Sequence, residues 1–292
     1  MFHGSRIILY SLIEITGVLP ETMRVLQLAL LAKAAGGFRP IGLFSSGYRL
    51  WGRAPRNMAS DWEAAHPRQY LAASAFNGAS DVVWRQSLRS ELGVRKKQAA
   101  ATLLWDLRKF YEGMRLDLLE QRAAALGFPE QITSVCLTAY RGARFVTMAS
   151  ISTGPFYSIN GVIAGCSMAT TFVRIYVMPV FDTLDIPRSV MLDIYIDDYG
   201  MSSVDLEHIV RQDLKEAAVS VMQAIQQDMC CSVSEDKSAV VASNSRLGKD
   251  LSAFLGVYAG PKPAPSAVTS ASTTRQARPG GRLEGARSIS NV

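Results

Sequence analysis

The stretch "DIYIDDYGM" (residues 193–201) places two aspartates, Asp197 and Asp198, side by side at the end of an apolar, β-rich run. Two tyrosines, Tyr195 and Tyr199, flank the pair. Adjacent carboxylates repel each other, and a cation bound between them relieves that repulsion. These residues alone leave three interpretations open: a polar hairpin turn, a structural cation site and a catalytic metal site.

A third carboxylate stands at the end of another apolar run. In "AATLLWDL" (100–107), Asp106 comes near the end of a predicted strand. Side chains alternate along a strand and a turn interrupts the alternation, so carboxylates at a hairpin tip and on a neighbouring strand can converge. We expect Asp106 to lie beside Asp197 on an adjacent strand, where the aspartates could bind two Mg²⁺ ions. Taken singly, an acidic residue at the end of a strand is more often a cap or a turn residue, so Asp106 alone favours that interpretation.

The composition indicates a large folded part followed by a basic tail. Of the 292 residues, 48% are hydrophobic and 19% are charged, which suits a real core and argues against an extended disordered chain. Residues 261–292 are rich in Pro, Ser, Gly, Ala and Thr, so we expect a disordered, low-complexity tail there. This tail carries most of the net charge of +6. Basic clusters elsewhere, such as Arg95–Lys97, fit either a solvated face or a nucleic-acid groove.

Several kinds of site are excluded by the motifs that the sequence lacks. It contains no GxxxxGK[ST] phosphate loop, no GxSxG nucleophile turn and no HExxH zinc motif. The four cysteines show no CxxC or Cys/His spacing, so we expect buried free thiols in a reducing compartment. Because charged residues and proline interrupt the apolar N-terminal stretch, no run of about 18 apolar residues occurs. We therefore expect an intracellular protein without a membrane partner.

The hydrophobic pattern predicts helices and strands that mix without a βαβα order. Two helices are expected within 5–35, and others at 45–54, 78–92, 111–126, 130–143, 167–184 and 205–229. Strands or hairpins are expected at 38–44, 100–107, 144–162, 189–196, 238–243 and 251–260, with a tight turn at 197–200. This mixture favours an α+β fold, with helices backing an antiparallel sheet.

Seven segments occur in an order that is found in one known family. They are "FRPIGLFSSGYRLWGR" (38–53), "AFNGASDVVWR" (75–85), "WDLRKFYEGM" (105–114), "GVIAGCSMATTFVRIYVMPV" (161–180), "YIDD" (195–198), "SEDKSAVV" (234–241) and "FLGV" (254–257). Over roughly residues 18–258, the chain resembles the reverse transcriptase domain of non-LTR (LINE-type) retroelements and group II introns. The Tyr-x-Asp-Asp signature is the most specific of these matches.

The resemblance implies a right-hand polymerase that copies an RNA template, extending a primer 3′-hydroxyl with dNTPs and two Mg²⁺ or Mn²⁺ ions. The reverse transcriptase-like domain would span residues 1–260, with fingers at roughly 18–99 and a palm at roughly 100–260. The thumb would be largely missing, which would make the chain a truncated element. A nuclear role follows from the resemblance alone, and the oligomeric state is left open.

The resemblance also assigns roles to single residues. Asp106, Asp197 and Asp198 would be catalytic and would hold the metal ions, and Lys237 would protonate the departing pyrophosphate. Tyr111 would be the steric gate that excludes a ribose 2′-hydroxyl. The other expected substrate contacts are Lys33, Arg39, Gly161, Gly165 and Tyr195. Without the resemblance, each of these residues also fits an ordinary structural role.

The chain departs from the family pattern near the expected nucleotide site. Ala164 stands where the family has glutamine, Phe110 replaces a small residue, and Glu112 stands where aspartate is common. Two functions therefore stay open at this point. One is an RNA-directed DNA polymerase, and the other is a catalytically inactive relic of the same fold that only binds RNA.

Overall fold

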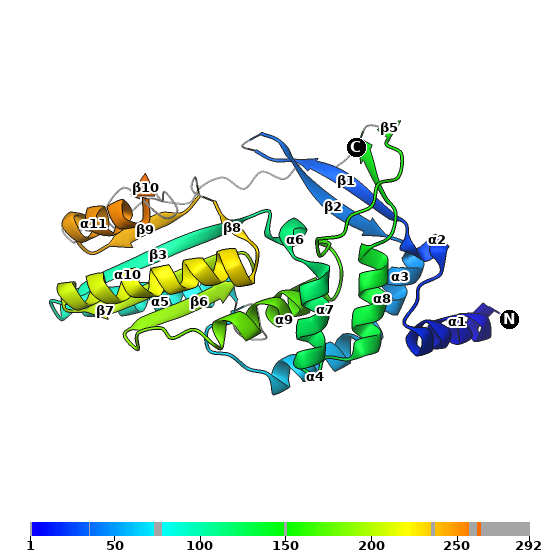
Figure 1. Cartoon of the computed structure of the whole chain (residues 1–292), viewed down its shortest axis with the longest axis horizontal. Helices are drawn as coiled ribbons and strands as arrows, with labels where there is room; N and C mark the ends of the chain where they lie inside the picture. Colours follow the sequence, from blue (N-terminus) through cyan, green and yellow to red (C-terminus); the bar gives the residue numbers. More distant parts are fainter. Residues whose placement is uncertain are drawn as a thin grey trace, which may run out of the picture.

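The structure of the chain is a computed structural model, which describes residues 2–34, 36–72, 78–148, 151–234, 237–256 and 262–263. Two β-sheets lie toward different ends of the molecule, with helices packed around and between them (Figure 1). Most strand pairs in both sheets are antiparallel. This confirms the predicted α+β class.

The larger sheet has the strand order β10-β9-β3-β7-β6, and β8 also pairs with β3. Its strands are β3 (Ala99–Arg108), β6 (Val190–Tyr195), β7 (Asp198–Asp205), β8 (Ser232–Val233), β9 (Ala239–Ala242) and β10 (Lys262–Pro263). β3 is central, because β7 pairs along one of its edges and β9 along the other. Its residues Leu103 and Trp105 are buried in the core, and the alternation of a strand therefore places Asp106 on the opposite face.

Two helices supply much of the core next to this sheet. α9 (Ala169–Phe181) is almost completely buried and mostly apolar, and its buried Arg174 pairs with Glu63. α10 (Glu207–Gln223) contacts β3, β6 and β7 and continues into a π-helical turn, η1 (Ala224–Asp228). Leu206, within the helix expected at 205–229, instead precedes α10 and is 54% exposed.

A third helix, α5 (Ala79–Arg95), packs against β3 and β7. Gly93 lies so close to Val204 that a Cβ there would come within 2.1 Å of the valine side chain. Arg89 of the same helix donates a hydrogen bond to Ser202. Side chains two residues apart lie on the same face of a strand, so α5, which contacts Ser202 and Val204, covers the face of the sheet on which Asp198 also lies.

The smaller sheet has the order β2-β1-β4-β5. Its strands are β1 (Leu26–Ala32), β2 (Phe38–Phe44), β4 (Arg144–Met148) and β5 (Ile151–Ser152). The remaining helices are α1 (Phe2–Thr16), α2 (Glu21–Arg24), α3 (Ser46–Trp51), α4 (Arg56–Ala65), α6 (Phe110–Gly113), α7 (Leu116–Ala125), α8 (Glu130–Tyr140) and α11 (Ser245–Gly256). Phe44 stacks on Tyr48 with ring centroids 4.5 Å apart, which joins β2 to α3.

The structure corrects the prediction of two helices within 5–35. The first is α1, but the run Leu26–Ala32 is the strand β1, which pairs with β2 over its whole length and with β4. Leucine and alanine favour helix in isolation. Here the pairing partners on both edges outweigh that local preference, as sheet context commonly does.

The structure also corrects the last predicted strand. The strand expected at 251–260 is instead the helix α11, in which Leu247, Leu251 and Leu255 are buried at four-residue steps. Residues 257–260 of that prediction lie outside the described residues. In the expected tail, Lys262–Pro263 form β10, and the remainder, 261 and 264–292, is likewise outside the described part.

Three smaller features differ from expectation or refine it. The helix expected at 111–126 is divided into α6 and α7, because Met114 adopts an extended conformation. The expected turn at 197–200 is shorter than predicted, and β7 begins within it. All four cysteines are free, as predicted, although Cys230 is exposed rather than buried. Within the described ranges, no helix is long and apolar enough to cross a membrane.

Candidate active site

The aspartate pair lies at the tip of the hairpin formed by β6 and β7. Tyr195 and Asp198 are opposite each other in the last pair of the ladder, so Ile196 and Asp197 form a two-residue turn. Ile196 has φ +58°, in the left-handed region that β-branched residues rarely adopt. Such local strain persists where the surrounding structure holds it in place, commonly at functional sites.

The structure places Asp106 beside this tip, as the sequence led us to expect. Asp106 and Asp198 are direct partners in the antiparallel pairing of β3 with β7. Directly opposite residues in such a pair project their side chains to the same face of the sheet. The backbone N–H of Leu107 donates to the Asp197 carbonyl at 3.1 Å, which extends the pairing to the residue before β7. Residues about 90 positions apart in the chain therefore share one edge of the site.

The electrostatic balance at the tip disfavours negative charge. Burial is the main cause that raises the pKa of the Asp197 carboxyl, and the nearby charge of Asp106 adds to it. Burial and then the charges of Asp197 and Asp106 raise the pKa of Asp198. Lys237 opposes both shifts, and Arg39 opposes that of Asp197. The cations of this chain thus compensate only part of the negative charge.

Lys237 is held in the site by a direct ion pair. Its Nζ lies 2.6 Å from Oδ2 of Asp106. The backbone N–H of Ser234 donates to the Asp106 carbonyl at 2.7 Å, and the N–H of Lys237 donates to the Ser234 carbonyl. This short chain of contacts, which sequence reasoning did not anticipate, anchors the segment after β8 against β3. No motif marks Ser234, because it contributes through its backbone.

The three aspartates supply ligands of the right chemistry for a divalent cation, but they do not form a complete coordination site. Carboxylate oxygens are the ligands that Mg²⁺ prefers, and two of the three carboxyls have raised pKa values that a cation would lower. In the described part of the chain, however, no three His, Cys, Asp or Glu residues are grouped closely enough to hold a metal ion. The Asp106 carboxylate instead has the Lys237 ammonium as its partner.

Tyr111 faces the same site from α6. Burial, followed by the charges of Asp197 and Tyr195, raises the pKa of its hydroxyl to about 12. Its carbonyl accepts a hydrogen bond from Val162 at 2.9 Å, so the loop that begins at Gly161 packs directly beneath it. The expectation that Tyr111 lies near the aspartates is met.

The two glycines expected at the nucleotide site have conformations that other residues rarely adopt. Gly161 has φ +98° and Gly165 has φ +103°. A Cβ on Gly161 would come within 3.2 Å of the Glu112 backbone, and one on Gly165 within 3.2 Å of the Gly42 carbonyl. Gly42 also donates to the Ala164 carbonyl at 3.4 Å, so this loop lies between α6 and β2.

The two basic residues expected to contact the triphosphate differ in position. Arg39 lies in β2, opposite Leu31, and its charge acts on Asp197. Lys33 lies at the end of β1, where its backbone pairs with Gly36 and Gly37. Among the described contacts, none joins Lys33 to the aspartates, so the structure brings Arg39 but not Lys33 to the tip.

Comparisons with known proteins agree with this geometry. A family model described as reverse transcriptase (RNA-dependent DNA polymerase) matches residues 31–259. No curated protein sequence matches the chain. Among solved structures, apo telomerase from Candida tropicalis, truncated from its C-terminal domain, is 14% identical with a TM-score of 0.57, covering 78% of this chain and 52% of that one.

Two telomerase complexes are similar to the chain in the same way. The enzyme from Candida tropicalis bound to the TWJ fragment of telomeric RNA is 13% identical, with a TM-score of 0.58, over 78% of this chain and 42% of its own. That from Candida albicans, also with the TWJ fragment, is 13% identical, with a TM-score of 0.56, over 78% and 43%. At these identities the likeness shows the fold alone, and this chain spans about half of their length or less.

The family model extends over more than half of the 292 residues and includes the aspartates of the hairpin tip. The larger sheet with its helices, and the smaller sheet beside it, correspond to the palm and fingers arrangement of the structural neighbours. The chain belongs to the reverse transcriptase (RNA-dependent DNA polymerase) family.

Proposed function

We propose that this chain is the RNA-directed DNA polymerase domain of a retroelement, of the non-LTR or group II intron type. It would add nucleotides from dNTPs to a primer 3′-hydroxyl along an RNA template. The observation that supports this most is the pairing of Asp106 with Asp198, next to Asp197, in a chain of the reverse transcriptase family. The RNA fragment bound by one telomerase neighbour is in line with an RNA partner here.

We infer that Asp106, Asp197 and Asp198 hold two Mg²⁺ or Mn²⁺ ions. When bound, such a pair of ions stabilises the attacking and the leaving oxygen of a nucleotidyl transfer. The raised pKa values of Asp197 and Asp198 support a cation at this position, because added positive charge favours their ionised forms. Asp106 would take part after its carboxylate separates from Lys237.

The residues around the aspartates would bind and orient the nucleotide. Arg39 offers a cation for the triphosphate, and Tyr111 presents a half-buried ring where the sugar would lie. The Lys237 ammonium, once released from Asp106, carries a proton for the departing pyrophosphate. Gly161 and Gly165 would let the backbone approach the base pair, because neither has a Cβ. Tyr195 and Lys33 remain expected substrate contacts.

A second function, RNA binding without catalysis, is favoured by one specific observation. The Lys237 ammonium already forms an ion pair with the Asp106 carboxylate. Among the described residues, no group of three or more His, Cys, Asp or Glu side chains could hold a metal ion. Ala164, which stands where the family has glutamine, removes a polar side chain from the loop beside β2. A protein that had lost catalysis could keep this ion pair permanently.

Primer extension separates the two functions. The purified protein would be given an RNA template with an annealed DNA primer, dNTPs and either Mg²⁺ or Mn²⁺. We expect extension with the wild type and none with Asp197→Asn, while both retain the RNA in a gel-shift assay. RNA retention without extension in either metal would instead establish the binding protein.

A second variant tests the steric gate at Tyr111. Tyr111→Val should leave dNTP extension measurable and increase the incorporation of ribonucleotides, because the smaller side chain no longer excludes the 2′-hydroxyl. Competition between a dNTP and the matching rNTP measures the ratio. An unchanged ratio would remove Tyr111 from the proposed gate without affecting the assignment of the aspartates.

A further inference from the structure

One segment of the chain carries only positive charge. Residues 22–60 include no aspartate or glutamate, and their basic residues are Arg24, Lys33, Arg39, Arg49, Arg53 and Arg56. None of these six forms an ion pair with a residue that the structure describes. The charge of Arg39 acts on Asp197 in the candidate active site. The last three arginines lie close together in the sequence and have no role assigned so far.

Arg49, Arg53 and Arg56 share one exposed face of the stretch from α3 to α4. Turns join the two helices, and the N–H of Arg53 donates to the Leu50 carbonyl at 3.2 Å. Buried residues recur through this junction at three- and four-residue steps: Tyr48, Trp51, Pro55, Ala59 and Trp62. The helical period therefore continues, and steps of four and three residues place the arginines on a common face. All three are exposed, and we call them the arginine row.

The arginine row is electrostatically unfavourable in the free protein. Like charges three or four residues apart along a helix destabilise it. The acids of α4 do not compensate the row. Asp61 comes five residues after Arg56, about 140° around the helix axis, and Glu63 pairs with Arg174 at 3.4 Å. An anion supplied from outside would relieve the repulsion.

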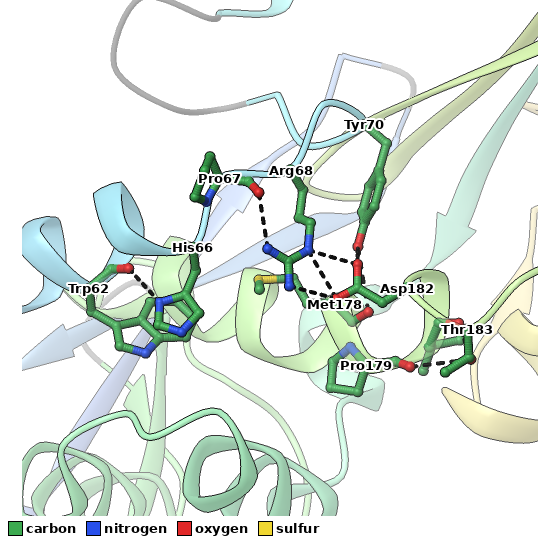
Figure 2. A network of polar contacts seen from close by, with 10 residues as sticks. Trp62, His66, Pro67, Arg68, Tyr70, Met178, Pro179, Asp182 and Thr183 are labelled. Carbon is green, nitrogen blue, oxygen red and sulfur yellow. Dashed lines mark hydrogen bonds and ion pairs between the residues drawn. The ribbon is translucent and has the colours of Figure 1, made fainter.

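Other arginines of the chain have carboxylate partners of their own. Arg68, the next arginine in the sequence, donates from Nε and Nη2 to the Asp182 carboxylate, at 2.8 Å for each bond (Figure 2). Arg141 pairs with Glu120 at 3.1 Å. In the described part of the chain, by contrast, no side-chain acceptor or carbonyl binds the guanidinium groups of the arginine row. Their donors are exposed and available to an acceptor from solution.

The arginine row adjoins the loop that is expected at the nucleotide site. The Ser167 hydroxyl donates to the Gly52 carbonyl at 3.0 Å, and Gly165 precedes Ser167 by two residues. A Cβ on Gly52 would come within 2.6 Å of the Ser167 Oγ, so the turn and the loop fit closely. The three aspartates belong to other elements, β3 and the hairpin of β6 and β7. The row is therefore next to the candidate active site without being part of its tip.

Exposed guanidinium groups at regular intervals match the phosphate backbone of a nucleic-acid strand. The planar fork of an arginine suits phosphate oxygens, and phosphates repeat along a strand as these arginines repeat along the helical stretch. The seven residues from Arg49 to Arg56 span about 10 Å, so the row can reach more than one phosphate. Such contacts hold a strand without reading its bases.

We propose that the arginine row holds a single strand of RNA by its phosphate backbone, independently of the RNA sequence. The choice of RNA rests on the proposed function, in which the template is RNA and is unpaired until it has been copied. Because the loop of Gly165 lies beside the row, RNA held there stays close to the aspartates. The row supplies affinity for the template and takes no part in nucleotidyl transfer.

Fluorescence anisotropy of a labelled, unstructured oligoribonucleotide with the full chain tests the proposal. EDTA is present and dNTPs are absent, so neither metal-dependent binding nor extension contributes. The triple variant Arg49→Gln, Arg53→Gln, Arg56→Gln should bind at least about tenfold more weakly at about 0.1 M salt. Its plot of log affinity against log salt should be less steep by about 2, since each phosphate contact to a single strand contributes about 0.7.

Two further triple variants separate local contacts from net charge and from folding. Arg115→Gln, Arg141→Gln, Arg211→Gln removes the same charge from arginines that are paired with carboxylates, and it should bind RNA almost as the wild type does. Arg49→Lys, Arg53→Lys, Arg56→Lys should keep the wild-type salt dependence, because neutralising phosphates requires charge above all. Thermal melting establishes that each variant is folded.

Three results would overturn the proposal. They are an unchanged salt dependence in the first triple variant, an equal loss of affinity in the paired-arginine control, and a loss that appears with a DNA strand of the same sequence but not with RNA. None of them bears on primer extension, which tests the polymerase proposal separately through Asp197→Asn. RNA affinity that depends on the row in a protein without extension would leave this proposal standing and remove only the polymerase.

Discussion

Aspartates occur in two settings in this protein, and their neighbours treat the negative charge in opposite ways. Asp182 has Arg68 and Tyr70 as direct hydrogen-bond partners, and these lower its pKa although burial acts against them. At the hairpin tip, burial and mutual repulsion raise the pKa values of Asp197 and Asp198. The charge of Asp182 therefore stabilises the folded protein, whereas the charges of Asp197 and Asp198 are unfavourable in it.

The difference separates a carboxylate whose charge the protein compensates from carboxylates whose charge it compensates only in part. A carboxylate that is already paired has its charge satisfied by the protein itself. A carboxylate left partly uncompensated at the end of a strand has an unmet demand for positive charge, which a ligand can supply. The following experiments test whether this contrast is real.

The largest effect is expected on activity. Asp198→Asn should reduce primer extension by at least about 10²-fold, because a neutral amide cannot replace a charged carboxylate in a nucleotidyl transfer site. Asp182→Asn, the matched variant in the compensated setting, should keep most of the wild-type rate per folded molecule. Initial rates on the same primer and template measure both. Equal losses in the two variants would mean that the settings do not differ in function.

The order reverses when stability is measured. Asp182→Asn should lower the free energy of unfolding by about 1–3 kcal/mol, because Arg68 loses a charged partner and one of the two oxygens that accept from Arg68 and Tyr70 becomes an NH₂ donor. Asp197→Asn should leave it unchanged or raise it by up to about 1 kcal/mol, since it removes an unfavourable charge. Urea denaturation gives both values. A stability loss in Asp197→Asn as large as that in Asp182→Asn would contradict the comparison.

Magnesium should act on the tip alone. Adding Mg²⁺ should raise the melting temperature of the wild type and of Asp182→Asn by a few degrees. A cation that binds only the folded protein stabilises it when the Mg²⁺ concentration is well above its dissociation constant. The double variant Asp197→Asn with Asp198→Asn should not respond, because two of its ligands are neutral. Differential scanning calorimetry with Ca²⁺ and Na⁺ controls separates specific binding from ionic strength. A response of the double variant would place the cation elsewhere.

The smallest effect concerns pH. Because the pKa of Asp182 is lowered by folding, its contribution to stability is complete above its ordinary value of 3.8 and is lost as the pH falls through its folded pKa. The pKa of Asp197 is raised by folding, so its unfavourable contribution is complete above the folded pKa and vanishes below 3.8.

Unfolding curves between pH 7 and about pH 3 check both signs. The stability difference between the wild type and Asp182→Asn should shrink on acidification. The opposite difference, between the wild type and Asp197→Asn, should shrink as well. If either difference grows as the pH falls, the direction assigned to that carboxyl is wrong.

Short-range patterns were enough to single out the three aspartates that the structure brings together. The apolar run before Asp106 and the "YIDD" tip each identify a carboxylate at the end of a strand. Because side chains alternate along a strand, these carboxylates are predicted to converge. The same patterns failed at Leu26–Ala32, where pairing on both edges makes a strand of residues that favour helix. They also failed for residues 251–256, because the helical period is visible only when Leu247 is included.

Residue order alone therefore established the α+β class and the three acidic side chains, since both depend on local periodicity and residue type. Only the folded chain decided which aspartate is compensated and which is not. It set Lys237 against Asp106 and turned Ile196 into the left-handed region. Electrostatic energy depends on distance and burial in three dimensions, and residues separated by a hundred positions become neighbours only after the strands have paired.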